Sequence, residues 1–251
     1  MIRGLYTATT GMMVERQKMD VLTNNIVNAD TTGYKSDTLT TSAFHDQILK
    51  RINDPNVSVI GTAVGKYSFG SHVDEMTTDF SQSTLEDTGR STDLALNGDG
   101  FFTVETPQGE RYTRAGNFAV DAQGYLVTAD GNYVLGQNGR IHTGSMDFTV
   151  GADGTVSAAG MRDRLRLVTF ADKTVLRKQG NSLYYVYGNA APVHAGNCQV
   201  RQGAQEVSNV SAADSMVDML TIYRKYEACQ KAVRTNDETL DLAAKLGRLG
   251  G

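Results

Sequence analysis

The stretch SAADSMVDMLTIYRKYEACQKAVRTNDETLDLAAKL, residues 211–246, decides the fold because it contains no glycine and no proline. One apolar series in it repeats every seven positions, at Met219, Tyr226, Val233 and Leu240. A second series, interrupted by polar residues, runs through Met216, Tyr223, Gln230, Asp237 and Ala244. Two offset seven-residue series predict one long helix with a narrow apolar stripe. At 1.5 Å per residue it would span about 50 Å, longer than a compact domain of this size.

The ends of this helix carry the expected signals. Ser211 followed by Asp214 can cap its start, because the hydroxyl accepts a bond from a free amide and the carboxylate faces the positive helix end. Gly247 and Gly250 are predicted to mark its finish.

A second helix is predicted at the start of the chain, which has no glycine or proline between Met12 and Thr32. Its apolar positions are Leu5, Met12, Met19, Leu22 and Ile26. Asn, Asp and Gly residues over 28–33 favour turns, so the helix should stop near Asn28. The two terminal stripes could pack onto their own domain, or pair with each other or with other subunits. The length of the helices favours pairing of the stripes with each other or with other subunits.

Between the helices, Gly-bearing turns separate short runs typical of strands. The runs cover residues 101–105, 110–114, 118–121, 125–128 and 133–135, and later 146–150, 164–170 and 183–187. This spacing predicts an antiparallel β meander. The fold class is therefore predicted to be α+β, with long terminal helices forming a coiled-coil layer and a central antiparallel all-β domain. The predicted divisions are residues 1–34, 35–90, 91–203 and 204–251. Residues 35–90, with a weak helical pattern around 44–52, are read as an extended linker and the start of the β domain.

Composition excludes several classes of protein. Of the 251 residues, 40% are hydrophobic and 21% charged, with a net charge of −4, which favours neither nucleic acid nor an anionic membrane surface. The longest apolar run, residues 183–187, is far shorter than the roughly 18 residues of a membrane span. The first ten residues lack the apolar core of a cleavable signal peptide. Cys198 and Cys229 lie 31 positions apart and form no C-x-x-C motif. They are therefore interpreted as buried or incidental thiols.

A search for chemistry finds no local constellation. His45, His72, His142 and His194 are far apart and form no pair at metal-binding spacing. No strained nucleophile turn and no complete phosphate or calcium loop is present in the sequence. We therefore expect no enzyme activity, no catalytic or metal site, no cofactor and no small-molecule substrate.

Three sequence motifs nevertheless resemble one family. The first covers residues 5–12 and 19–35, the second 93–102 and 112–118, and the third 203, 206–210, 216–217 and 223–227. In this order they are similar to bacterial flagellar rod and hook proteins. The motif positions are Asn24, Asn25, Asn28, Gly33, Asp93, Gly98, Gly100, Phe101, Phe102, Tyr112, Arg114, Gly116, Ser208, Asn209 and Val210.

The resemblance implies a structural subunit of the flagellar basal body, exported by the flagellar secretion apparatus without a cleavable signal peptide. It implies assembly into a helical homopolymer beside other rod and hook subunits, with the terminal helices as an inner coiled-coil layer. The assembly seam would then comprise Leu5, Met12, Met19, Leu22, Ile26, Met216, Met219, Tyr223, Tyr226, Val233 and Leu240.

Within this family the space between the helices holds one β domain, which favours a rod subunit over a hook subunit. The opening motif is closer to the distal rod type, although residues 27–30 depart from the commoner pattern and leave the proximal type open. Two other functions stay open: a cell-wall glycan-binding module using Tyr112, Tyr125 and Tyr133, and a hydrolase.

Overall fold

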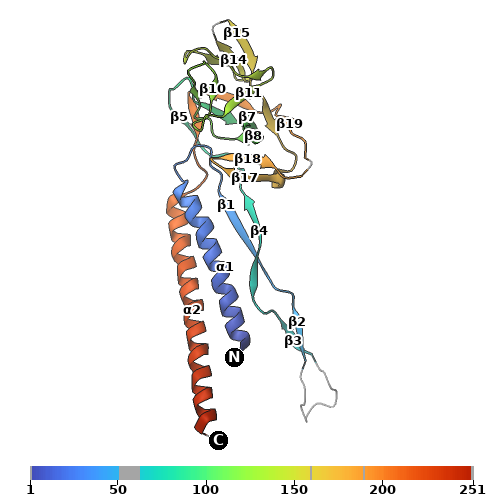
Figure 1. The fold of residues 1–251 in the computed structure, drawn as a ribbon, viewed down its shortest axis with the longest axis vertical. Coiled ribbons are helices and arrows are strands. Elements are labelled where there is room, and N and C mark those ends of the chain that lie inside the picture. Colours follow the sequence, from blue (N-terminus) through green and yellow to red (C-terminus); the bar gives the residue numbers. More distant parts are fainter. Residues whose placement is uncertain (1, 51–62, 159, 189, 250–251) are drawn as a thin grey trace. The chain divides into compact units, whose positions relative to one another are not determined.

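The computed structural model describes residues 2–50, 63–158, 160–188 and 190–249, and its fold is drawn in Figure 1. The chain divides into two compact units. Unit 1 comprises residues 1–26, 37–77 and 212–251, and unit 2 comprises residues 27–36 and 78–211. Unit 1 holds the helices and unit 2 holds most of the strands, so the predicted α+β class is confirmed.

Unit 1 contains α1 (Ile2–Val27) and α2 (Ala212–Leu249). Helix α1 ends where predicted, immediately before the turn-forming residues 28–33. Helix α2 begins after Ser211 with Asp214 in its first turn, as predicted. It runs past Gly247, so the prediction that this glycine ends the helix is wrong. A single glycine costs a helix only about 1 kcal/mol, which the long flanking helix tolerates.

The half-buried residues of α2 alternate at spacings of three and four. They are Ala212, Ser215, Met219, Ile222, Tyr226, Cys229, Val233, Asn236 and Leu240. This is the pattern of a helix that lays one narrow stripe against a neighbour. The first predicted series lies on this stripe. The second half-buried series passes through Ile222 and Cys229. Each of its members lies one residue before a member of the predicted second series, which passes through Met216 and Tyr223.

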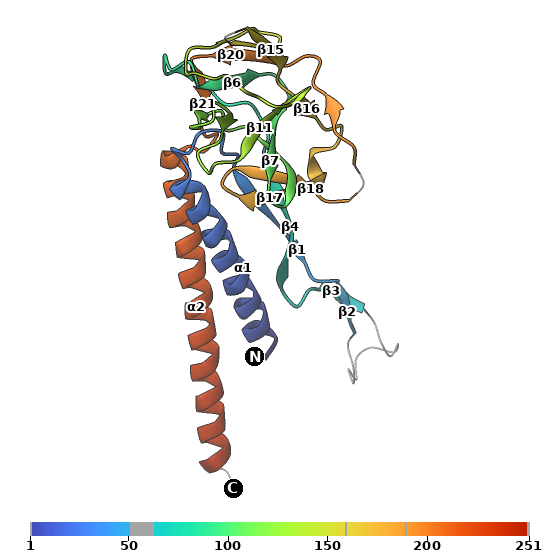
Figure 2. The ribbon, with the colours of Figure 1, turned by 45° about the horizontal axis from the view of Figure 1, so that its top comes forward.

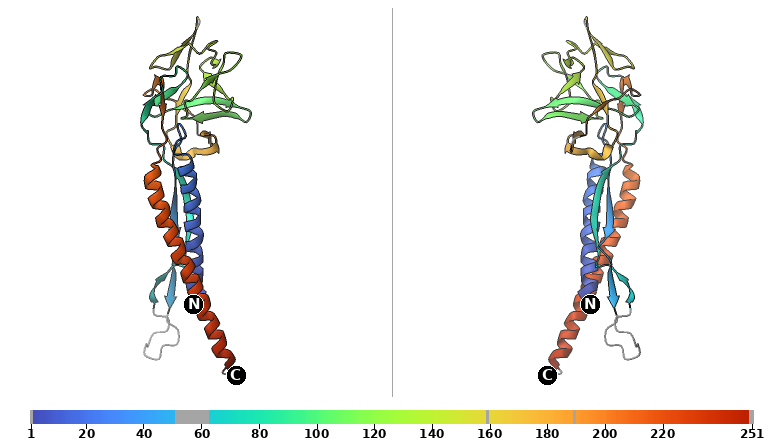
Figure 3. Two further views of the ribbon diagram at one scale, coloured as in Figure 1. Left: turned by 90° about the vertical axis from the view of Figure 1, so that its left-hand side faces the viewer. Right: turned by 90° about the vertical axis from the view of Figure 1, so that its right-hand side faces the viewer.

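Helix α1 has neighbours on two sides in unit 1. A Cβ atom added to Gly11 would lie 3.4 Å from the Sγ atom of Cys229, so α2 approaches closely there. On another side, Thr10 lies against Gly70, and Val14 is only 5% exposed. Figure 3 shows the two helices of unit 1 from two sides. Helix α1 therefore packs against neighbours along two stripes. The seven-residue apolar pattern predicts only one of them.

The segment read as a linker forms two antiparallel ladders. Strand β1 (Asp37–Ala43) pairs with β4 (Ser71–Thr78), and β2 (Gln47–Lys50) pairs with β3 (Ala63–Tyr67). The weak helical pattern around residues 44–52 does not produce a helix in its described part, where pairing with β3 gives strand β2 instead. Residues 51–62 lie outside the described chain.

Unit 2 is built around a ten-stranded sheet, seen from another direction in Figure 2. Its main path is, in order, β17 (Leu176–Gly180), β18 (Leu183–Val186), β8 (Gly109–Thr113), β7 (Phe101–Thr106), β11 (Tyr133–Gly136), β10 (Leu126–Val127) and β9 (Ala119–Val120). Beside this path lie β12 (Gly139–Arg140), β16 (Leu167–Thr169) and β19 (Val193–His194). All its pairings are antiparallel, as predicted, but β7 separates β8 from β11, so the sheet is not a simple meander.

Smaller ladders complete unit 2. Three strands form one sheet: β13 (Thr149–Val150), β14 (Thr155–Ala158) and β15 (Met161–Arg164). Strand β20 (Gln199–Gln202) pairs with β6 (Leu94–Asn97), and β21 (Ala204–Glu206) pairs with β5 (Leu85–Asp87). A short 3-10 helix, η1 (Lys173–Val175), precedes β17. The C-terminal motif thus enters unit 2 as strands before α2 begins.

Two buried clusters meet at β7. Phe102 belongs to the larger cluster and packs edge-on against Phe118 at 5.1 Å between ring centroids. Phe101 belongs to an aromatic cluster with Phe80 and Tyr184. Successive strand residues point to opposite faces of a sheet. The adjacent phenylalanines therefore supply one core each.

None of the described helices is long and apolar enough to cross a membrane.

Candidate functional site

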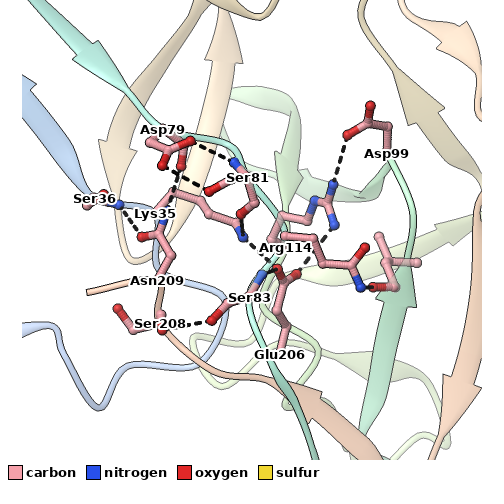
Figure 4. A network of polar contacts seen from close by, with 12 residues as sticks. Lys35, Ser36, Asp79, Ser81, Ser83, Asp99, Arg114, Glu206, Ser208 and Asn209 are labelled. Carbon is pink, nitrogen blue, oxygen red and sulfur yellow. Dashed lines mark hydrogen bonds and ion pairs between the residues drawn. The ribbon is translucent and has the colours of Figure 1, made fainter. Parts of the chain in front are cut away.

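The three sequence motifs converge within unit 2. Lys35 from the first motif, Arg114 from the second and Glu206 from the third meet there, and all three side chains are 0% exposed. Figure 4 shows this cluster with its polar neighbours. Residues 171 positions apart in sequence thereby become direct partners.

Glu206 is the centre of the cluster. Its Oε1 atom lies 2.5 Å from the Lys35 Nζ atom and accepts a hydrogen bond of 3.0 Å from the Ser83 amide. Its Oε2 atom accepts a hydrogen bond of 3.4 Å from the Arg114 guanidinium. The Lys35 ammonium also donates to the Ser81 carbonyl oxygen at 2.7 Å. Both carboxylate oxygens are thus satisfied, as a buried charge requires.

Burial governs the electrostatics of Lys35. Desolvation lowers the pKa of its ammonium below the usual value, and the hydrogen bond and charge of Glu206 oppose that shift. The protonated form consequently depends on Glu206. Removing one partner of such a buried pair costs about 3–5 kcal/mol, because the other charge remains buried without compensation.

Arg114 links this cluster to the surface. Its Nη2 atom lies 3.9 Å from the Asp99 Oδ1 atom, and its guanidinium lies 5.3 Å from the centre of the Phe101 ring. Asp99 is also paired with Lys173 at 2.7 Å. That hydrogen bond is the main reason why the pKa of Asp99 is lowered. A chain of alternating charges therefore leads from the buried carboxylate to solvent.

Two motif glycines are required by close approach of the backbone. Gly33 has a φ of 66°, and a Cβ atom on it would lie 2.4 Å from the Ala115 nitrogen. A Cβ atom on Gly116 would lie 1.6 Å from the Leu94 carbonyl oxygen. Side chains cannot fit at these distances. These glycines allow the first and second motifs to reach the cluster.

The motif asparagines replace missing backbone partners. Asn209 accepts a hydrogen bond from the Ser36 amide at 2.7 Å and donates one to the Asp79 carbonyl at 2.9 Å. In unit 1, Asn25 does the same for Asp37, accepting from its amide at 3.0 Å and donating to its carbonyl at 2.8 Å. An amide side chain can both donate and accept, so it substitutes for a strand neighbour.

The remaining motif residues are placed as follows. Phe101, Phe102 and Tyr112 lie in the two cores. Asp93 is buried and accepts from the Thr88 hydroxyl, and Gly100 lies against Cys198. Asn24 lies in the last turns of α1, and Asn28, Gly98, Ser208 and Val210 stand in turns or between strands and helices. Burial raises the pKa of the Cys198 thiol, which favours the uncharged, unreactive form.

The seam residues lie elsewhere, in unit 1. Half-buried positions are Leu5, Met12, Met19, Leu22, Ile26, Met219, Tyr226, Val233 and Leu240. By contrast, Met216 and Tyr223 are 56% and 50% exposed. Beside them Val217 and Leu220 are 63% and 60% exposed, so the first turns of α2 carry an apolar face that the described residues of unit 1 leave exposed.

Several residues of the buried cluster and of the α2 stripe could not be identified from the sequence pattern used above. Lys35 and Glu206 belong to recognised motifs, but nothing local indicates that they are partners. Ser83 contributes only its backbone amide and therefore leaves no signal in the sequence. Ile222 and Cys229 could have been found by testing the neighbouring register of the seven-residue pattern.

The arrangement is that of a structural junction. No group of three or more His, Cys, Asp or Glu side chains in the described parts of the chain could hold a metal ion. Of the tyrosines considered for glycan binding, Tyr112 is only 6% exposed and packs against Phe170. Tyr125 and Tyr133 contact each other edge-on at 5.7 Å. Of the three tyrosines, Tyr112 is therefore buried in the core and not exposed on a surface.

Comparison with known families finds three matching descriptions along the chain. Residues 5–35 match "Flagella basal body rod protein". Residues 95–158 match "Flagellar hook protein FlgE/F/G D1 domain". Residues 201–246 match "Flagellar basal body rod FlgEFG protein C-terminal". These ranges contain much of the three motifs that meet at the buried cluster.

Individual proteins are similar over the same span. The flagellar basal-body rod protein FlgG of Bacillus subtilis is 34% identical, covering 99% of this chain and 100% of its own length. The flagellar basal-body rod protein FlgF of Caulobacter vibrioides is 34% identical, covering 100% of this chain and 99% of its own. The flagellar hook protein FlgE of Treponema pallidum is also 34% identical, but over 51% of this chain and 27% of its own length.

Proposed function

Because the chain belongs to the family of flagellar basal-body rod proteins, as a structural subunit of the rod, we propose that its helices assemble with those of other copies into the wall of a helical tube. The β domain would form the outer part of the wall and transmit torque from motor to hook. Full-length similarity to rod proteins, against half-length similarity to a hook protein, favours the rod over the hook. Within the rod we propose the distal position, because the opening motif of the sequence is closer to the distal rod type.

The observation that carries this proposal is the two-sided character of α2. One stripe is half-buried within the protomer, at alternating spacings of three and four. The outer apolar residues Met216, Val217, Leu220 and Tyr223 are each at least 50% exposed. A helix with apolar residues on two sides needs more than one neighbour. Neighbouring copies and other rod and hook subunits would supply the second contact, as an inner coiled-coil layer.

We also propose that the chain reaches the basal body through the flagellar export apparatus. The full-length similarity to the rod proteins FlgG and FlgF supports this proposal.

Deletion of the gene is expected to remove the rod, and expression of this chain is expected to restore it. The measurement is electron microscopy of purified basal bodies, together with swimming in soft agar. Basal bodies with complete rods in the deletion strain would contradict the proposal. Restored rods without any of this chain in the purified rod fraction would contradict it equally.

The pairing of the two helices can be tested in the monomer. Gly11→Cys is expected to form an intrachain disulfide with Cys229 on mild oxidation, because the added Cβ atom would lie 3.4 Å from the Cys229 Sγ atom. The disulfide is measured as faster migration in a non-reducing gel that a reductant reverses. Gly4→Cys is the matched control, since its Cβ atom faces Asn236 instead. Equal crosslinking of both variants would show that the helices do not hold this register.

A further inference from the structure

The cluster joins three short segments of unit 2 that we name the clamp: residues 33–36, 79–84 and 205–209. The first segment contains no strand, and all of it is described. Its backbone bonds go to the other two segments, from the Gly33 amide to the Glu206 carbonyl at 2.7 Å and from the Asp79 amide to the Ser36 carbonyl at 2.9 Å. The side chains of Lys35, Glu206 and Asn209 add the bonds described above.

The clamp segments have a particular place in the chain. The chain passes between the two units after residues 26, 36, 77 and 211. The passages after residues 36, 77 and 211 lie within two residues of a clamp segment, and the passage after residue 26 lies seven residues before the first one. Tension applied through α1, β1, β4 or α2 therefore reaches the clamp before it reaches the strands of the ten-stranded sheet. A rod subunit that transmits torque would load this part of unit 2 first.

We propose that the clamp opens and closes as one cooperative unit, and that the buried Lys35–Glu206 pair holds it closed. Glu206 receives bonds from both other segments, through Lys35 Nζ and the Ser83 amide, so loss of its charge weakens the links to both segments at once. Without Glu206, Lys35 would be a buried cation that keeps its hydrogen bond to the Ser81 carbonyl and the attraction of the Asp79 charge. The β7–β8 ladder makes its own hydrogen bonds and does not need the clamp. This goes beyond the assembly function, since it concerns the monomer.

The test is hydrogen exchange on the full-length monomer carrying Glu206→Gln. Exchange at the amides of Gly33, Ser36, Asp79 and Val207 is expected to accelerate together, by about a hundredfold or more, because one charge of the buried pair loses its partner. Amides of the β7–β8 ladder are expected to change by less than about twofold. Glu105→Gln is the matched control, because it breaks an exposed pair with Arg140 at 2.6 Å. It should change none of these amides.

Lys35→Met is the second variant. It removes the cation but leaves Glu206 paired with Arg114, so the same amides should accelerate together, by a smaller factor. Acceleration confined to Ser83 would overturn the proposal, because the segments would then not open together. Equal acceleration of the β7–β8 ladder, or failure of both variants to fold, would also overturn it, because the pair would then belong to the global core. None of these outcomes depends on rod assembly.

Discussion

Val233→Asp is expected to abolish rod assembly while leaving the β domain folded. Val233 lies half-buried on the three-and-four stripe of α2, between Cys229 and Asn236. A carboxylate there must be desolvated when the helices pack, at a cost of about 1–3 kcal/mol for each subunit. In a helical polymer every subunit repeats that cost, so growth should stop. The readouts are the absence of rods in basal bodies and loss of swimming.

The matched control for this variant is Ala232→Asp, which places the same charge on the neighbouring exposed position. It should assemble better than Val233→Asp. Secretion of both variants and the circular dichroism of the purified monomers establish that the β domain is intact. Normal rods with Val233→Asp would show that packing along this stripe is not needed for assembly.

Gly116→Ala is expected to destabilise unit 2 by about 3 kcal/mol or more. The added Cβ atom would lie 1.6 Å from the Leu94 carbonyl oxygen, which belongs to the backbone of β6 and cannot turn aside. The clash would also disturb the hydrogen bond from the Leu94 amide to the Gly116 carbonyl, now 3.0 Å long. The measurement is the urea midpoint of the β-domain transition, followed by near-UV circular dichroism.

Gly196→Ala is the control for this substitution. Apart from its chain neighbours, no described residue has an atom within 4 Å of a Cβ atom added there, and its φ is not in the left-handed region. Its stability should stay within about 1 kcal/mol of the unchanged protein. If Gly116→Ala unfolded at the same urea concentration as Gly196→Ala, close backbone approach would not explain the motif glycine.

The sequence predicted features that depend on local order. Helix α1 ends before residues 28–33 because those residues favour turns, and the antiparallel strands follow from Gly-bearing turns between short apolar runs. The seven-residue series through Met219 and Val233 lies on the half-buried stripe of α2. The second series was placed one residue away from the observed one. Ser215 and Asn236 are polar, so an apolar pattern does not identify them.

In the candidate site, too, one part could be predicted from the sequence and another could not. The motif residues could be recognised one by one, and Gly33, Arg114 and Asn209 each proved to serve the junction. Their common location could not be predicted, because Lys35 and Glu206 are separated by 171 positions. The pairing of β1 with β4 could not be predicted for a related reason. Its strands are far apart in sequence and half-exposed, so their alternation is weak.

By itself, the sequence determined the helices, the antiparallel strands and the family, because periodicity, turn residues and motifs are properties of neighbouring residues. Only the tertiary structure decided which charges are buried together, which glycines must lack a side chain, and which register of α2 is covered. Those are properties of residues distant along the chain. The free energy of a buried ion pair or a close backbone contact depends on what surrounds it, and folding alone supplies those surroundings.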